Sequence, residues 1–139
     1  MSNNRKRHLL SLFVLLVFGL LAIGSFDTKE DTKKSQAPSY TLTADQLYSD
    51  YESNETAADS KYKGRIVVIS GTIQDMGIDL MNNAYIVIGG EGSLDGAQCS
   101  FAKDQKSAVA LLSRGQNVTV KGLVLGKMGN VVLYNCTLQ

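Results

Sequence analysis

The sequence predicts a small all-β barrel that carries helices and follows a membrane-directed N-terminal segment. Three observations lead to this fold class. Five strand-like runs with alternating apolar residues occupy much of the chain after residue 40. A capped helical pattern precedes the first three runs, and a second helical pattern separates them from the last two. Short strands interrupted in this way are typical of a closed barrel rather than of a parallel α/β sheet.

The N-terminal segment has the pattern of an export signal or a membrane anchor. A basic cluster at residues 5–7 precedes an uncharged, mostly apolar stretch over residues 9–26. Eighteen helical residues span about 27 Å, slightly less than a hydrocarbon core of about 30 Å. Ala22 and Gly24 offer a small-x-small cleavage site. We therefore expect residues 1–26 to be either a signal peptide cleaved near Gly24 or a single-pass transmembrane anchor.

Residues 27–39 are predicted to form a flexible polar linker. They alternate charged and small polar residues around Pro38 and offer no apolar face to bury. A chain of this length has a reach of roughly 20 Å, which would hold the domain of residues 40–139 near the membrane. The basic cluster should stay on the cytoplasmic side while the rest of the chain crosses.

The composition of residues 40–139 argues against several functions. They contain eight Lys/Arg and ten Asp/Glu, so the domain carries a net charge of −2, which disfavours nucleic acid as a partner. The only histidine, His8, lies in the N-terminal segment, which excludes histidine-based catalysis in the domain. No Cys/His cluster indicates zinc, and the segment GGEGSLDG lacks the ending of a phosphate-binding loop. We expect no cofactor, no metal and no catalytic residue.

The first predicted element of the domain is a helix that begins at Thr43. The sequence T-A-D-Q places a Thr at the N-cap and a Gln three residues later, and Leu42 and Leu47 occupy the positions of a hydrophobic staple. Leu47, Tyr48, Tyr51 and Ala58 then recur at helical spacing and define the face that packs.

Three strands and a turn are predicted next. Residues 64–73 alternate, and one side, Val67, Ile69, Gly71 and Ile73, is the expected barrel interior. Gly71 would let this strand bend. A turn around residues 79–83 leads to AYIVIG at 84–89, and after a glycine-rich loop the chain returns as AQCSF at 97–101.

The remaining elements are a helix and a hairpin. Lys103 to Arg114 reads as helix, with Ala108, Leu111 and Leu112 apolar and Gly115 following its end. NVTVKGLVL and NVVLYNCTL then flank a tight GKMGN turn. The expected inward set of the first of these strands is Val118, Val120, Gly122 and Val124.

This order matches the five-stranded Greek-key barrel of the OB fold, with an extra N-terminal helix and a helix between strands three and four. The segments YKGRIVVISGTI, GAQCSF and GQNVTVKGLVLGKMGNVVLYNC, with the lead-in DQLYSDYESNETAADSKYKG, resemble the exported bacterial OB-fold family described as tRNA-anticodon-domain-like (tRNA_anti-like). The resemblance covers residues 43–138. It implies an OB fold outside the cytoplasm, at the bacterial inner membrane or in the periplasm, and it transfers no catalytic residue.

Cys99 and Cys136 are predicted to form a disulfide. They end the third and fifth strands, which are neighbours in a closed OB barrel. In an exported domain the bond would close a loop of about 37 residues and contribute roughly 3–4 kcal/mol. The alternative is that both are small buried thiols. A redox-active pair is disfavoured because the C-x-x-C spacing is missing.

Ligand contacts are expected where OB barrels usually bind, over strands two and three and their loops. The candidates are Tyr85, Phe101, Glu91 and Asp95, the last two in the glycine-rich loop. The alternatives are that the two aromatic residues belong to the core and the rim, and that the loop is a plain connection rather than a calcium contact.

Three function classes follow from these observations. We favour a noncatalytic binding module that contacts an envelope protein or glycan. A protein that binds single-stranded nucleic acid is the alternative, although basic residues are few. An envelope enzyme is the third, in which Asp75 and Asp79 would pair, but both are expected in a solvated polar turn.

Overall fold

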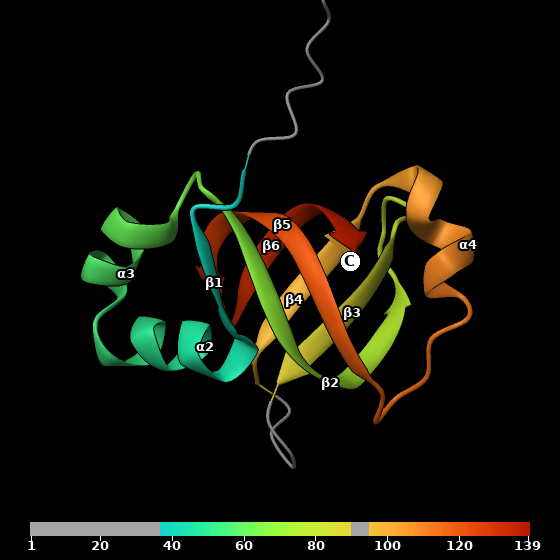
Figure 1. The fold of residues 1–139 in the computed structure, drawn as a ribbon, viewed down its shortest axis with the longest axis horizontal. Coiled ribbons are helices and arrows are strands. Elements are labelled where there is room, and N and C mark those ends of the chain that lie inside the picture. Colours follow the sequence, from blue (N-terminus) through green and yellow to red (C-terminus); the bar gives the residue numbers. More distant parts are fainter. Residues whose placement is uncertain (1–36, 90–94) are drawn as a thin grey trace, which may run out of the picture. The chain divides into compact units, whose positions relative to one another are not determined.

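The computed structural model describes residues 37–89 and 95–139 and shows a barrel flanked by helices (Figure 1). Its helices and strands follow the predicted order, preceded by one additional short strand. The bounds are β1 Tyr40–Thr43, α2 Ala44–Ser53, α3 Glu55–Tyr62, β2 Ile66–Ile78, β3 Ala84–Gly89, β4 Ala97–Phe101, the 3-10 turn η1 Lys103–Gln105, α4 Lys106–Val109, β5 Asn117–Met128 and β6 Asn130–Leu138.

Strands β2 to β6 close into a five-stranded barrel. β2 pairs antiparallel with both β3 and β5, which joins the two ends of the sheet. β3 and β4 are antiparallel, as are β5 and β6, whereas β4 and β6 are parallel. This is the topology of the OB fold, so the predicted fold class is confirmed.

The long strand β2 belongs to two halves of the barrel. Its residues 66–72 pair with β5, and its residues 72–78 pair with β3, with a register shift between Ile73 and Asp75. At Gly71 a Cβ atom would lie 2.6 Å from Cγ2 of Ile88, so the close approach of β3 requires glycine there. The strand extends to Ile78, five residues beyond its predicted end.

The barrel interior contains the side chains that period-two alternation predicted. Their branched apolar groups exclude water from the centre of the closed sheet. The side chains that are at most 1% exposed include Val67, Ile69 and Ile73 from β2, Ile86 and Ile88 from β3, Val120 and Val124 from β5, and Val131 and Leu133 from β6.

The predicted first helix is correct at its start but is divided in two. The Thr43 hydroxyl accepts a hydrogen bond from the backbone N of Gln46 (3.1 Å), which confirms the N-cap. Asn54 has extended backbone angles and interrupts the helix, and its side chain caps α3 by accepting from the N of Ala57 (3.0 Å). Leu42 lies in β1, which pairs parallel with β2. A strand of four residues was too short to be recognised from its pattern.

Two tyrosines join α2 and α3 to each other. The Tyr51 hydroxyl donates to Asp59 (3.0 Å) and the Tyr62 hydroxyl donates to Asp50 (2.6 Å), while both rings are 1% exposed. Burial first, and then these hydrogen bonds, raise the pKa of both tyrosines. Both helices lie on one side of the barrel, and α4 lies on the opposite side (Figure 1).

The predicted second helix over residues 103–114 was too long. Only η1 and the four-residue α4 are helical, and Val109 is the buried residue. Leu111 is 85% exposed and Ala108 is also exposed, so the predicted apolar face is wrong at both. The chain turns toward β5 instead, because the N of Gly115 donates to the carbonyl of Ile73 (2.8 Å) and ties this loop to β2.

Within the described residues, no helix has the length and apolar character needed to cross a bilayer. The predicted signal peptide or anchor of residues 1–26 and most of the predicted linker lie outside those residues.

Candidate functional site

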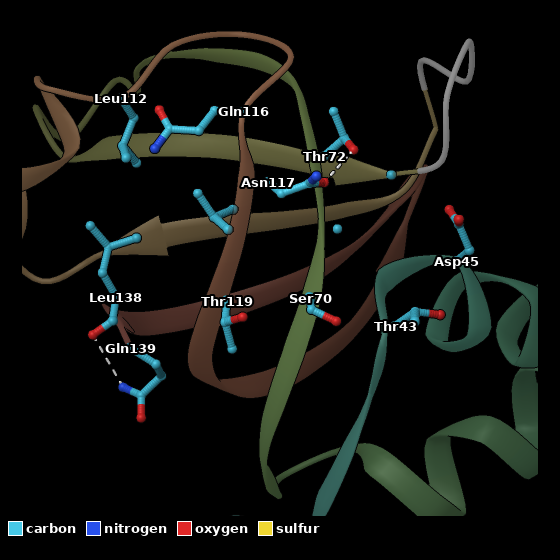
Figure 2. A pocket seen from close by; sticks show the side chains of 13 residues that line it. Thr43, Asp45, Ser70, Thr72, Leu112, Gln116, Asn117, Thr119, Leu138 and Gln139 are labelled. Carbon is cyan, nitrogen blue, oxygen red and sulfur yellow. Dashed lines mark hydrogen bonds between the residues drawn. The ribbon is translucent and has the colours of Figure 1, made fainter.

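A polar groove of about 710 Å³ crosses the outer face of β2 and β5 (Figure 2). Thr43 and Asp45, at the start of α2, lie on one side of it, and Gln139 lies on the other. We call this cavity the polar groove. Its hydroxyl and amide side chains are Thr43, Ser70, Thr72, Gln116, Asn117, Thr119 and Gln139.

The strand register explains why these side chains face outward. Ser70 pairs with Thr119 and Thr72 pairs with Asn117 across β2 and β5. The intervening Ile69 and Val120 are buried in the barrel, so the polar residues share its outer surface. Val118 was also expected to point inward, but it is only partly buried and lines the groove. The Thr72 hydroxyl donates a hydrogen bond to the side-chain oxygen of Asn117 (2.8 Å), which links the two strands on this face.

The groove is neutral except for one carboxylate. Among its lining residues, Asp45 is the only charged one, and no lysine or arginine is present. Leu112, Val118 and Leu138 add apolar surface between the polar groups. This arrangement offers hydrogen bonds to hydroxyl and amide groups, and it offers no cation to a phosphate.

A second cavity of about 620 Å³ lies on the face that OB barrels usually use for binding. Tyr85 and Val87 of β3 line it together with Gln98 of β4. Arg114 and Asp75 form an ion pair at this cavity, and both are largely accessible to solvent. Such an exposed pair contributes little to stability, so Arg114 is available to an anionic ligand at small cost.

The four predicted ligand-binding residues do not form one site. Tyr85 lines the second cavity, whereas Phe101 is 2% exposed and packs in the core, as the alternative for it expected. Asp95 is exposed and lies near Tyr48 of α2. The pKa of Tyr48 is raised, first by the burial of Tyr48 and then by the negative charge of Asp95. Glu91 lies outside the described residues. In the described ranges, no three His, Cys, Asp or Glu residues come together as a metal site.

The two cysteines lie on neighbouring strands. Both are completely buried, and β4 and β6 are paired with Cys99 opposite Leu133 and Phe101 opposite Cys136. A hydrogen bond with the Cys136 side chain, together with burial, raises the pKa of the Cys99 thiol. The predicted adjacency of the strands is therefore confirmed. Both thiols are free in this structure, and the disulfide stays a prediction.

The two carboxylates considered for catalysis have structural partners. Asp75 lies within β2, not in the predicted turn, because that strand continues to Ile78. Asp79 accepts hydrogen bonds from the backbone N of Asn83 and of Met81, which lower its pKa. Asp79 therefore holds the β2–β3 turn together.

The sequence analysis missed the polar groove. Ser70 and Thr72 were recognised as the side of the strand opposite to the interior, but nothing indicated that they would be joined by Thr119 and Asn117. The available signal was that polar residues alternate with inward ones on both strands. This signal indicates a common polar surface only when the pairing of the two strands is known.

The closed barrel and its topology define a protein of the OB-fold class. Residues 1–138 match the tRNA_anti-like family, and the chain belongs to that family. Among solved structures, a protein from Klebsiella pneumoniae subsp. pneumoniae described as a "putative nucleic acid-binding lipoprotein" has the same fold, with a TM-score of 0.60. It is 20% identical, and the match covers 71% of this chain and 90% of that one. A search of curated proteins found no match.

Proposed function

We propose that this protein is a noncatalytic binding module of the bacterial cell envelope and that its ligand is a glycan. The observation that carries the proposal is the polar groove, in which hydroxyl and amide side chains surround a cavity with a single carboxylate. Sugar hydroxyl groups both donate and accept hydrogen bonds, and Ser, Thr, Asn and Gln side chains match them in both respects.

The groove also favours a glycan over a phosphate-bearing polymer. A nucleic acid gains most of its affinity from contacts between phosphates and cations, and the lining residues provide none. The apolar groups of Leu112, Val118 and Leu138 are suited to the C–H faces of sugar rings. Because the groove is open and its lining residues include no aromatic side chain, we expect weak binding of each sugar unit.

The proposed location is the outer side of the bacterial inner membrane. The apolar stretch over residues 9–26 supports export, and a structural neighbour that is described as a lipoprotein is consistent with the envelope. The segment either remains as a single-pass anchor or is cleaved near Gly24, which releases the domain into the periplasm. A protein of the envelope is the other partner that this location allows.

The glycan proposal is tested by titrating the isotope-labelled protein with soluble peptidoglycan fragments and chitooligosaccharides while its amide resonances are followed. We expect shifts at Ser70, Thr72 and Thr119 and none at Tyr85. Thr119→Val removes a hydroxyl and nearly preserves shape, so it should weaken binding several-fold. Thr41→Val, on an exposed strand position outside the groove, should leave binding unchanged. Shifts confined to Tyr85, or none at all, would overturn the proposal.

Single-stranded nucleic acid is the second candidate, and it would use the second cavity. Tyr85 offers a ring for base stacking and Arg114 offers a cation, while Gln98 and Asn130 offer base-edge hydrogen bonds. The name of the structural neighbour agrees with this function. Binding of an oligonucleotide should weaken steeply with salt and be lost in Tyr85→Ala. The absence of binding at low salt would eliminate this candidate.

A further inference from the structure

The β2–β3 turn exposes three large apolar side chains within four residues. Ile78 is 53% exposed, Leu80 is fully exposed and Met81 is 78% exposed. Single exposed apolar residues are common, but a cluster at the tip of a hairpin marks a surface that contacts something apolar. Neither the polar groove nor the second cavity includes these residues.

The turn is held in one conformation by its own hydrogen bonds. The Asp79 carboxylate accepts from the backbone N of Met81 and of Asn83, both at 2.9 Å. The N of Asp79 donates to the carbonyl of Asn83, and the N of Asn82 donates to the carbonyl of Asp79, again at 2.9 Å. These backbone groups therefore need no water, and moving the tip into an apolar medium leaves none of them unpaired.

Lys106 of α4 lies beside this tip. Its ammonium group donates a hydrogen bond to the side-chain oxygen of Asn82 (3.0 Å). A lysine side chain can lie along apolar surface while its charge stays among polar headgroups. Lys106 therefore places a positive charge next to the apolar tip, and the Asp79 carboxylate is turned toward the N–H groups of the turn itself.

We propose that the β2–β3 turn enters the surface of an anionic phospholipid bilayer, with Leu80 and Met81 among the acyl chains and Lys106 at the headgroups. The inference rests on the proposed membrane anchor. The predicted linker of residues 27–39 would have a reach of roughly 20 Å, so an anchored domain would meet the bilayer at high effective concentration. A few apolar side chains then suffice to orient it, although they would bind weakly alone. A partner protein is the other possible occupant, and the experiment below distinguishes it from the bilayer.

The chain contains no tryptophan, so a single one introduced by substitution reports on its own position. Full-length Leu80→Trp is reconstituted into vesicles of phosphatidylglycerol and phosphatidylcholine, some with brominated acyl chains that quench nearby tryptophan. Met128→Trp is the matched control. Met128 is also apolar and 75% exposed, and it lies by the β5–β6 turn, beside Lys127, which contacts Glu52 of α2. This contact places the turn on the side of α2, and α2 and α4 lie on opposite sides of the barrel (Figure 1).

We expect the emission of Leu80→Trp to shift to shorter wavelength and to lose most of its intensity in brominated vesicles, at a depth of roughly 5–10 Å. The emission of Met128→Trp should be unchanged. A Leu80→Trp chain that floats with the vesicles but whose tryptophan stays unquenched would overturn the contact alone and would favour a protein as the occupant. Equal quenching in both variants would also overturn it. A chain that does not float at all would overturn the anchor, and the tip contact with it.

Discussion

Oxidation of Cys99 and Cys136 is predicted to stabilise the domain strongly. We expect the disulfide because both thiols lie in the core on paired strands and are already in contact. The perturbation that tests its effect is removal of the bond by a reductant. The bond would close a loop of about 37 residues, for which the loop-entropy relation gives about 4 kcal/mol at 25 °C. For a domain of this size that corresponds to a melting temperature lower by about 15–30 °C after reduction.

The state of the cysteines is measured first, on protein isolated from cells without reductant. Because the hydrogen bond with Cys136 and burial raise the pKa of the Cys99 thiol, it reacts slowly in the folded domain, and alkylation must be done in denaturant. An intact mass with no alkyl group added indicates the disulfide. The same measurement reports whether the N-terminal segment has been cleaved.

Thermal unfolding with and without reductant then gives the magnitude. The double variant Cys99→Ala and Cys136→Ala is the control, and its melting temperature should not respond to reductant. Two alkyl groups on the isolated protein would refute the bond. A bonded protein whose melting temperature is the same after reduction would refute the loop-entropy reasoning.

Three further predictions concern stability. The pKa values of the Tyr51 and Tyr62 hydroxyls are raised in the folded domain, so the unfolded chain loses these protons first as the pH rises. The contribution of the two tyrosines to the free energy of unfolding should therefore be constant below about pH 10 and should decrease above it. Thermal unfolding from pH 8 to 11 checks this, and Tyr51→Phe should flatten the profile. Gly122→Ala would place a Cβ 2.5 Å from Cys136 Sγ, and urea denaturation should show a loss of about 1–3 kcal/mol. Asn54→Ala removes the α3 cap and should cost about 1 kcal/mol in the same assay; no change would contradict the capping role.

Much of the barrel was predictable because its strands alternate. Burial on one face of a strand imposes a period of two, and Val67, Ile69 and Ile73 of β2 and Val120 and Val124 of β5 followed it, whereas Val118 did not. The first helix was also predictable at Thr43, where a hydroxyl satisfies a local donor. The break at Asn54 was missed because an asparagine that caps one helix and ends another has no strong signal inside an amphipathic pattern.

The parts that the sequence did not predict depend on contacts between distant segments. α4 is short because the loop after it is tied to β2 through Gly115, which no local pattern encodes. The polar groove exists because Ser70 and Thr119 become neighbours when the barrel closes. Residues within one strand show which side is polar, but only the register across strands shows that two polar sides form one surface.

The parallel pairing of β1 with β2 has a mechanical consequence. The N of Ser39 donates to the carbonyl of Ile66 (2.7 Å), and Tyr40 to Thr43 then pair in step with residues 67–70. These hydrogen bonds lie side by side along β1 and join it to the barrel strand β2. A force applied at Ser39 along the strand would therefore load the β1–β2 hydrogen bonds before it reached α2, whose first residue follows Thr43 directly.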